Sequence, residues 1–384
     1  MKRALAKSAP RLVLAAGSTL VALLFVEVSL RVLGLVPPAA FYQLDPLTGH
    51  SHRPGAQGWF RQEGEAYIEI NERGLRGPPV VGDKAREVLR LAVLGDSFTE
   101  GLQVPFEQTF GPVLERALAS SCAPTSEVIG FGVSDYGTAQ ELLTLRERVW
   151  QYEPDIVVLA FLTGNDIRNN SRKLDPISNR PYFTLEAGAL VPDDGFRDWQ
   201  KPRRTYFSII SRSALLLWLD YLRARLKMGW RSGRPVAGEA GIDERVYTNP
   251  STRDWEQAWA ITELLLLAIK REVEEHGAKL LVITLSNGIQ VHPDPSIRRA
   301  FAERLGVSDL YYSDLRLADF GELHGISVLN LAPAFQRYAE THSVFLHGFE
   351  NGQLGFGHWN DKGHALAAEL VGRRLCDELR RNFD

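Results

Sequence analysis

Three apolar segments of this sequence each end abruptly in residues that could take part in nucleophilic catalysis. Their ends read Gly95-Asp96-Ser97, Gly130-Phe131-Gly132 and Gly164-Asn165-Asp166. A serine can attack a carbonyl carbon, while a glycine N–H and an asparagine amide can hold the negative oxygen that forms. Each feature alone has a simpler explanation, because serine and asparagine often cap helices and glycine often occupies turns. Together they favour Ser97 as a nucleophile, with its own N–H, Gly132 and Asn165 as an oxyanion hole.

The three segments belong to a pattern of short apolar runs that alternate with helical segments from Val88 onward. The expected strands cover residues 88–95, 127–134, 155–164, 279–286 and 327–333. Apolar strands of this kind need cover on both faces, which is typical of a doubly wound, mostly parallel α/β sheet. In such a sheet, ligands bind in the crevice at the carboxyl ends of the strands. The three motifs are therefore expected to meet at one edge of the sheet.

Two regions of the domain organisation differ from this pattern. Residues 37–87, rich in Gly, Pro and aromatic residues, include "AYIEINERGLRG", which predicts a short edge strand followed by a glycine turn. We interpret them as a membrane-proximal extension packed onto the main domain, residues 88–384, with no chemistry of its own.

Residues 167–250 predict an insertion with a hairpin turning at Ala187-Gly188 and a long amphipathic helix over 207–228. This helix is either a lid over the crevice or, as we prefer, a cover for the flank of the sheet.

The first 36 residues predict a membrane anchor. Residues 1–11 form a basic tail, and residues 12–36 are mostly apolar and would span roughly 37 Å as a helix, enough for a bilayer core of about 30 Å. Glu27 and Arg31 are four residues apart and are expected to pair near the far interface. The basic tail is expected in the cytoplasm and the catalytic domain in the periplasm or outside the cell. The alternative is a cleaved signal peptide, although no clean small-x-small site closes the apolar run.

The overall composition argues against other classes of function. A formal net charge of −3 over 384 residues, without a long basic stretch, gives no indication of a nucleic-acid partner. No Cys/His cluster has zinc spacing, and "HSH" at 50–52 is only a weak metal candidate, so neither a metal nor a cofactor is expected. The histidines between His276 and His347 lack motif context and are expected at the surface or in loops.

The motifs resemble, in the same order, the sequence blocks of the SGNH, or GDSL-type, hydrolases. "GDSFTEG", the glycine of "GFGVSDYG" and "GND" match the first three blocks, and "GHWNDKGHALAAEL" stands where the fourth block carries a histidine. The resemblance covers Val88 to the C-terminus apart from the insertion. It implies a flavodoxin-like sheet and ester hydrolysis or acyl transfer without metal, with Ser97 as nucleophile and Ser97, Gly132 and Asn165 as oxyanion donors. Related sequences often differ at Gly130 and Asp135, but neither departure removes a donor.

Two histidines compete for the role of general base. Many members of the family have Asp-x-x-His in the fourth block, and "DKGH" matches it with Asp361 and His364. The wider block instead aligns His358 with the catalytic histidine. Asn360 is a natural N-cap, so His364 would lie inside the last helix, whereas His358 would lie in the glycine-containing loop before it. We therefore predict His358 as the base and keep Asp361 and His364 as the alternative.

This choice leaves the histidine without its usual acid, because Gly355 stands three residues before His358. The sequence predicts a Ser–His dyad, or a triad with an unusual third member. A backbone carbonyl of residues 355–357 or the carboxylate of Glu350 could orient the ring. Asp96 and Asp166 lie nearby in the expected crevice, but acids in these blocks more often hold loops together.

These features predict a serine esterase or deacylase that acts on an ester at the cell envelope, such as an acylated glycan or a lipid ester. A sugar hydroxyl in place of water would make the protein an O-acyltransferase, and a non-catalytic glycan-binding envelope protein is a further alternative. Cys122 and Cys376 would lie near the same edge in a flavodoxin-like sheet. They could therefore form a disulfide bridge, and two buried free thiols are the alternative.

Overall fold

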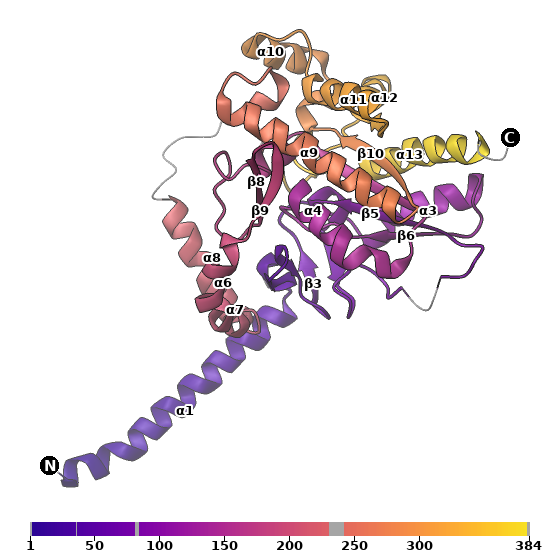
Figure 1. The fold of residues 1–384 in the computed structure, drawn as a ribbon. Coiled ribbons are helices and arrows are strands. Elements are labelled where there is room, and N and C mark those ends of the chain that lie inside the picture. Colours follow the sequence, from indigo (N-terminus) through magenta and orange to yellow (C-terminus); the bar gives the residue numbers. More distant parts are fainter. Residues whose placement is uncertain (1, 36, 81–83, 230–241, 382–384) are drawn as a thin grey trace.

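The computed structural model describes residues 2–35, 37–80, 84–229 and 242–381. Parts of the expected tail, anchor, extension and insertion, at residues 1, 36, 81–83 and 230–241, lie outside the described residues. Figure 1 shows a central sheet layered between helices, from which one long helix, α1 (Lys2–Val32), projects.

A five-stranded parallel sheet forms the centre of the main domain. Its strand order is β11-β10-β7-β5-β6, and every neighbouring pair is parallel. Numbered along the chain, this is the 2-1-3-4-5 order of flavodoxin-like folds. The predicted doubly wound α/β fold is therefore confirmed, and the arrangement fits the SGNH hydrolase fold. The strands are β5 (Leu89–Gly95), β6 (Ser126–Gly130), β7 (Ile156–Leu162), β10 (Lys279–Leu285) and β11 (Ser327–Asn330).

Helices cover both faces of this sheet. One face packs against α4 (Thr138–Thr144), its continuation η3 (Leu145–Val149) and η4 (Trp150–Tyr152), α9 (Arg253–Glu275), α10 (Pro295–Leu305) and α11 (Tyr312–His324). The other packs against α3 (Phe110–Ser121), α12 (Ala332–His342) and α13 (Asp361–Arg381). Short 3-10 turns η2 (Phe106–Gln108) and η7 (Gly288–Val291) precede α3 and α10.

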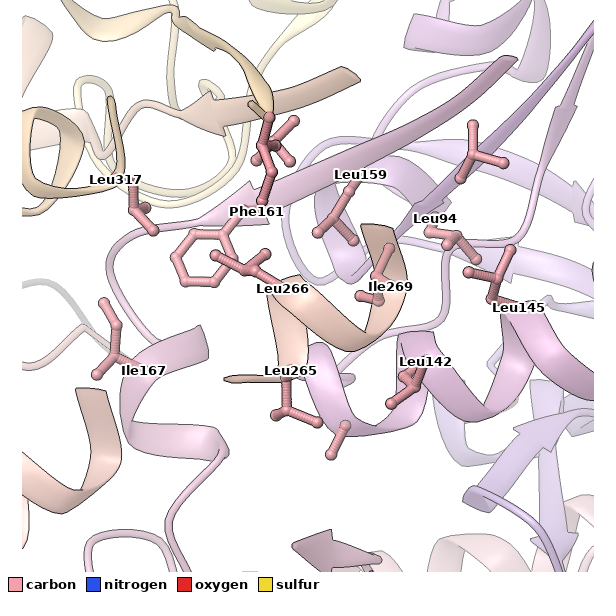
Figure 2. Packing of buried hydrophobic residues seen from close by; sticks show 14 of the residues in the cluster. Leu94, Leu142, Leu145, Leu159, Phe161, Ile167, Leu265, Leu266, Ile269 and Leu317 are labelled. Atoms are coloured by element: carbon pink, nitrogen blue, oxygen red, sulfur yellow. The ribbon is translucent and has the colours of Figure 1, made fainter. Parts of the chain in front are cut away.

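The strands are apolar along most of their length because alternate side chains enter two separate cores. In β5, Ala92 and Leu94 face α4 and α9, whereas Leu91 and Val93 face α3 and α13. Figure 2 shows the first of these cores, where side chains of β5 and β7 meet those of α4, η3 and α9. The two cores fix the sheet rigidly, so the loops at its carboxyl edge have a firm base.

A disulfide bridge joins the first crossover helix to the last helix. Cys122 directly follows α3 and Cys376 lies in α13, and their Cα atoms are 5.6 Å apart. The two helices pack against one another on the same face of the sheet. The structure therefore contains the bridge that the flavodoxin-like topology allows, and the alternative of free thiols is not observed in the described chain.

The extension forms two small antiparallel hairpins after the turn η1 (Pro38–Phe41). They pair β1 (Tyr42–Asp45) with β2 (Gly49–His52), and β3 (Gln57–Phe60) with β4 (Ala66–Glu69). Buried and exposed residues alternate along β4, as the predicted edge strand requires, and Gly74 follows with a φ of +75°. The small core of the extension includes Leu102 from the loop that follows Ser97. The extension is therefore packed directly against the predicted nucleophile loop.

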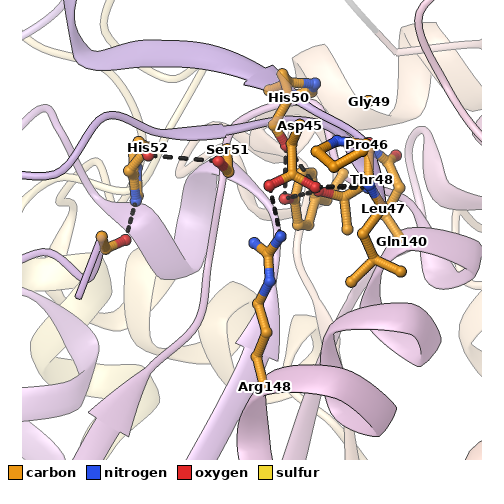
Figure 3. A network of polar contacts seen from close by, with 12 residues as sticks. Asp45, Pro46, Leu47, Thr48, Gly49, His50, Ser51, His52, Gln140 and Arg148 are labelled. Atoms are coloured by element: carbon orange, nitrogen blue, oxygen red, sulfur yellow. Dashed lines mark hydrogen bonds and ion pairs between the residues drawn. The ribbon is translucent and has the colours of Figure 1, made fainter. Parts of the chain in front are cut away.

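A polar network also attaches the extension to the main domain (Figure 3). Asp45 Oδ1 accepts hydrogen bonds from the backbone N–H groups of Leu47 and Thr48, which shapes the turn between β1 and β2. Arg148 Nη2 lies 2.5 Å from Asp45 Oδ2, and Gln140 Nε2 donates to the Thr48 carbonyl over 2.8 Å. Because Gln140 belongs to α4 and Arg148 to η3, the turn is fixed to the helical layer.

The insertion agrees with the prediction in its hairpin and differs in its helical part. Its elements are α5 (Asp166–Asn169), β8 (Tyr182–Glu186), β9 (Ala189–Asp193), α6 (Gly195–Gln200), η5 (Lys201–Arg203), α7 (Arg204–Ile210), α8 (Ala214–Gly229) and η6 (Glu244–Tyr247). β8 and β9 turn at Ala187-Gly188, as predicted. The single helix expected over 207–228 is instead two helices, because the Glu27 carboxylate binds the N–H groups of Ala214 and Leu215 and starts a new one.

The position of α8 is a second correction. This helix lies against α1, α7 and η1 and has its main contacts there. The preferred interpretation, a helix that covers the flank of the sheet, is therefore wrong. The cause is the same as for the break in the helix: α8 begins at a carboxylate of α1, which leads it away from the sheet.

The helix α1 contains the stretch Val13–Val32, which is long and apolar enough to cross a membrane and has none of its residues buried. A signal sequence would share this length and composition. Arg31 Nη2 lies 2.7 Å from Glu27 Oε1, which confirms the predicted pair within this helix.

Candidate active site

Ser97 is the first residue of α2 (Ser97–Glu100), a single helical turn directly after β5. Asp96 caps this turn, since Asp96 Oδ1 accepts a hydrogen bond of 2.9 Å from Phe98 N. A Cβ at Gly95 would lie 2.2 Å from Thr99 Oγ1, so the sharp turn into α2 has room only for glycine there. The Ser97 hydroxyl is not used as a cap. It contacts His358, with 2.8 Å between Oγ and Nε2.

The two candidate histidines occupy very different environments. Asn360 Oδ1 accepts hydrogen bonds from Lys362 N and Gly363 N and so starts α13, which leaves His358 in the preceding loop. His364 is buried in the first turn of α13, where burial lowers its pKa to about 3. Asp361 is exposed at the start of that helix. Among the described residues, neither Asp361 nor His364 forms a hydrogen bond with the Ser97 hydroxyl, whereas His358 does.

The second ring nitrogen of His358 contacts Glu63, in the turn between β3 and β4. His358 Nδ1 lies 2.6 Å from Glu63 Oε2, and the backbone N–H of His358 donates to Glu63 Oε1 over 2.7 Å. Gly357 has a φ of +79°, and a Cβ there would lie 2.2 Å from Glu63 Oε1. Glycine at 357 therefore leaves the space that the carboxylate occupies. One carboxylate holds both the ring and the backbone of His358.

Glu63 was missed by the sequence analysis, which assigned no chemistry to the extension that carries it. Of the residues considered there, Glu350 is exposed, and the Gly357 carbonyl accepts a hydrogen bond from His347 Nδ1 instead. Glu63 stands 295 residues before His358, so no local motif connects them. The one available signal was the short edge strand predicted within "AYIEINERGLRG", residues 66–77, because an acid just before it falls in a turn.

The charges of Glu63 and His358 shift the pKa of each other. Burial acts to raise the pKa of Glu63, but the hydrogen bonds and the charge of His358 outweigh it, so this pKa lies below its ordinary value. Burial acts to lower the pKa of His358, but the hydrogen bond and charge of Glu63 outweigh it, so this pKa is raised. Glu63 is therefore ionised, and His358 is a stronger base than a free histidine. With Nδ1–H donated to Glu63, the lone pair of Nε2 faces the Ser97 hydroxyl.

The predicted oxyanion donors follow three neighbouring strands beside Ser97. Gly132 lies against α2, where a Cβ would be 2.5 Å from Glu100 N. Within the described part of the chain, neither the Ser97 N–H nor the Gly132 N–H donates a hydrogen bond. The Asn165 side chain lies close enough to Asp96, next to the nucleophile, to act against the rise in the pKa of that carboxyl, and its Oδ1 has no hydrogen-bond partner among the described residues. The structure thus brings all three groups to the edge where Ser97 lies.

Three buried carboxyl groups stand behind this edge: Asp96, Glu141 and Asp166. Burial raises the pKa of each, to about 6 for Asp96, and the charge of Asp96 adds to the shift of Glu141 and Asp166. Asp166 Oδ2 accepts a hydrogen bond of 2.7 Å from Leu162 N, much as Asp96 binds Phe98 N. Asp96 and Asp166 therefore hold the loops at the strand ends.

A second buried histidine supports the His358 loop. His347 Nδ1 lies 2.7 Å from the Gly357 carbonyl, its Nε2 lies 2.9 Å from Ser286 Oγ, and burial lowers its pKa to about 4. This histidine lies in a loop, one of the two predicted locations, but it is not at the surface, because its ring packs beside Phe98 and Trp359 under the His358 loop. His292, expected in the same way, is also buried.

The histidines of "HSH" attach the extension to the turn that begins with Ser97 and to the loop that follows β6. His52 Nε2 lies 2.5 Å from Glu100 Oε1 at the end of α2, and Tyr42 donates to the same oxygen over 2.7 Å. His50 Nε2 contacts the Ser134 carbonyl at 2.8 Å. Among the described residues, no group of three or more His, Cys, Asp or Glu side chains is placed to hold a metal ion.

Comparisons with known proteins gave structural neighbours only. No family model and no curated protein sequence matches the chain. The similar solved structures include an acetylxylan esterase from Geobacillus stearothermophilus, with 12% identity over 77% of this chain and 95% of that one and a TM-score of 0.39. A lipase/acylhydrolase from Enterococcus faecalis shows 14% identity over 75% and 96%, with a TM-score of 0.36. A putative lipolytic protein of the G-D-S-L family from Desulfitobacterium hafniense DCB-2 shows 12% identity over 74% and 98%, with a TM-score of 0.34.

Proposed function

We propose that the protein is a serine esterase or deacylase that works through an acyl-serine intermediate. The observation that carries this proposal is the continuous chain of hydrogen bonds from Glu63 through His358 to Ser97. Nucleophile, base and orienting acid in this order are the arrangement that activates a serine hydroxyl. An α/β domain that only binds a glycan has no need of it, which argues against the non-catalytic alternative.

The first half-reaction forms the acyl-serine. His358 Nε2 takes the proton of the Ser97 hydroxyl while Oγ bonds to the carbonyl carbon of the ester, whose π electrons move to its oxygen. The N–H groups of Ser97 and Gly132 and the Asn165 side chain stabilise this oxyanion. The intermediate collapses, the bond to the alkoxy oxygen breaks, and the His358 imidazolium gives its proton to the leaving alcohol. The acyl group stays on Ser97.

The second half-reaction releases the acyl group. His358 removes a proton from water, the resulting hydroxide oxygen attacks the acyl carbon, and Ser97 leaves with the proton returned by His358. A sugar hydroxyl in the place of water would transfer the acyl group instead. Throughout, Glu63 holds Nδ1 protonated and stabilises the positive ring. Because its carboxylate also binds the backbone of His358, it fixes the position of the ring as well as its tautomer.

We further propose that α1 anchors the enzyme and that the catalytic domain lies outside the cytoplasm, where an envelope ester would be its substrate. The basic residues before the apolar stretch favour a cytoplasmic tail. The bridge between Cys122 and Cys376 supports the location of the domain, since disulfides persist in oxidising compartments.

The test of the catalytic proposal is hydrolysis of p-nitrophenyl acetate by the full chain in detergent micelles. Ser97→Ala should lose about 10⁴-fold or more in kcat, because the proposed nucleophile is removed. Ser120→Ala, an exposed serine on α3, serves as the matched control and should keep the full rate. Equal rates for Ser97→Ala and the unaltered protein would overturn the proposal. Adding an oligosaccharide acceptor and measuring acetyl transfer against acetate release separates transferase from esterase.

A further inference from the structure

The start of α8 is bound to a carboxylate within the apolar stretch of α1. Glu27 accepts hydrogen bonds from Ser213 Oγ at 2.9 Å, Ala214 N at 3.0 Å and Leu215 N at 2.9 Å. These N–H groups belong to the first turn of α8 and would otherwise lack partners. The helix of the insertion therefore begins beside α1, little more than one turn before α1 ends at Val32.

Further contacts hold α7 and α8 to the same end of α1. Arg31 Nη2 donates to the Arg212 carbonyl between the two helices over 2.8 Å, and Trp218 Nε1 donates to the Leu35 carbonyl. In Figure 1, α1 projects from the molecule and α8 runs crosswise to it from this end. If α1 crosses a bilayer, α8 lies along the surface of that bilayer.

The outer side of α8 carries an apolar row that nothing in the described structure covers. We call it the leucine stripe; it consists of Leu216, Leu219, Leu222 and Leu226. Spacings of three and four residues place these side chains on one face of the helix. They are 37%, 54%, 45% and 75% exposed, and Ile209 of α7 is exposed by 57%. A surface helix with such a row next to a membrane span has the pattern of an interfacial helix.

Positive charge lies on the adjoining side of α8, which Leu217 and Asp220 face, and it comes nearest to the stripe at Leu216, one turn before Asp220. A cavity of about 520 Å³ between the hairpin β1–β2 and α7–α8 is lined by Arg53, Arg204 and Arg212, together with apolar side chains of the two helices and Asp220. Within the described part of the chain, none of these three arginines forms an ion pair with a carboxylate. Burial and the positive charges of Arg31 and Arg212 lower the pKa of Arg53. The cavity therefore has an excess of cationic groups that an anion would compensate. We call it the arginine cavity.

We propose that the leucine stripe and the arginine cavity form a docking surface for a bilayer that contains anionic phospholipid. The leucines would enter the boundary between headgroups and acyl chains, and the arginines would bind headgroup phosphates. We identify the partner as a bilayer because the leucine stripe begins where the exposed apolar surface of α1 ends, so the two apolar surfaces are continuous. This inference rests on the proposed membrane anchor and extends it from one helix to a second contact.

The docking surface would also fix the distance between the active site and the surface of the bilayer. Gly34, at the end of α1, lies against Trp59 of β3, and Arg61 donates to the Leu33 carbonyl over 3.4 Å. Glu63 is two residues beyond Arg61, so it is at most about 7 Å of extended chain away. The acid that orients His358 is therefore tied closely to the end of the anchor. A second membrane contact at α8 would prevent the domain from tilting about that end.

The test measures the membrane depth of single labels in the full chain reconstituted in vesicles. Both native cysteines are in the disulfide, so Leu222→Cys provides one thiol for an environment-sensitive fluorophore. Leu323→Cys, at a 78% exposed leucine on α11 away from α1 (Figure 1), is the matched control. Val21→Cys, in the middle of the span, reports on the anchor itself. A lipid-borne nitroxide quenches labels in the bilayer, and aqueous iodide quenches labels in water.

We expect lipid quenching at Leu222 and Val21 and iodide quenching at Leu323. Iodide quenching at Leu222 with lipid quenching at Val21 would overturn the docking surface and leave the anchor intact. Iodide quenching at both would overturn the anchor and the docking surface together. Hydrolysis of p-nitrophenyl acetate by the same samples reports on the catalytic proposal independently.

The role of the arginine cavity is tested by changing the vesicles. Adding phosphatidylglycerol to phosphatidylcholine should favour the lipid-inserted state of the Leu222 label by roughly five-fold per arginine engaged. Arg53→Gln with Arg212→Gln should remove this gain, whereas Arg373→Gln with Arg380→Gln, two exposed arginines of α13, should keep it. Inorganic phosphate should not reproduce the gain. A gain that survives Arg53→Gln with Arg212→Gln, or that free phosphate produces, would overturn the headgroup contact.

Discussion

The carboxyl edge of the sheet and the N-terminal extension each supply residues of the proposed catalytic unit, but these residues are positioned in two different ways. Ser97 follows β5 directly, and its place is set by a cap at Asp96 and a glycine at 95. Glu63 has no such local setting, because it lies in a hairpin turn and meets His358 only where the extension docks. A role fixed by the neighbouring backbone can be recognised from sequence. A role fixed by docking cannot.

The largest effect on activity is expected from replacing His358, and it distinguishes this residue from His364, six residues later in the chain. His358→Ala should reduce kcat by about 10⁴-fold, since the proton acceptor for Ser97 is lost. His364→Ala is the matched control and should keep activity within roughly ten-fold, because its pKa of about 3 makes it a poor base. Initial rates with p-nitrophenyl acetate measure both. A greater loss in His364→Ala than in His358→Ala would place the base inside α13.

The next effect tests whether the extension takes part in the chemistry. Glu63→Gln should reduce kcat by about 10²- to 10⁴-fold, because a neutral amide neither fixes the tautomer of His358 nor stabilises its positive form. Glu65→Gln changes an exposed acid of the same turn, which pairs with Arg61, and should leave the rate unchanged. Thermal unfolding of both variants checks the fold. Similar rates for the two variants would remove the extension from the mechanism.

A smaller effect concerns pH and distinguishes an electrostatic role of Glu63 from a purely structural one. Glu63 raises the pKa of His358, so its replacement should lower that pKa. The base form of His358 is the active form, so kcat/KM rises with pH as the ring loses its proton. In Glu63→Gln this rise should begin at lower pH than in the unaltered protein, although the plateau is lower. Profiles with the same midpoint would show that Glu63 does not act through charge.

The smallest effect on activity should come from the disulfide, which lies away from the edge of the sheet. Cys122→Ser with Cys376→Ser should leave kcat nearly unchanged while it lowers the free energy of unfolding by about 2–5 kcal/mol. Thermal unfolding and initial rates on the same sample measure the two quantities. A large fall in kcat at a temperature where the variant is folded would connect α13 to the site more tightly than we infer.

The sequence predicted the sheet and its edge because both depend on local patterns. Uninterrupted apolar strands such as β7 require cover on two faces, and this alone indicates a doubly wound fold. The motifs at Ser97, Gly132 and Asn165 each follow a strand directly, so their common location follows from the topology. The N-cap at Asn360 likewise separates His358 from His364 by local rules.

The sequence failed where a distant partner changes the outcome. The helix expected over 207–228 has continuous apolar periodicity, and it divides only because Glu27 of α1 binds the start of α8. His347 has no motif, and it is buried only because the loop at 355–358 folds over it. Glu63 lies in a turn of ordinary composition. In each case the deciding contact joins segments far apart in the chain, which single-sequence patterns do not report.

Because 295 residues separate Glu63 from His358, the parts of the site are also synthesised at different times. At synthesis rates of about 5–20 residues per second, the acid leaves the ribosome roughly 15–60 s before the histidine. During that interval the chain holds a serine and a carboxylate with no base between them. In the proposed mechanism, Ser97 therefore stays inactive until nearly the whole polypeptide has been made, and a chain that stops before residue 358 lacks the base that Ser97 needs.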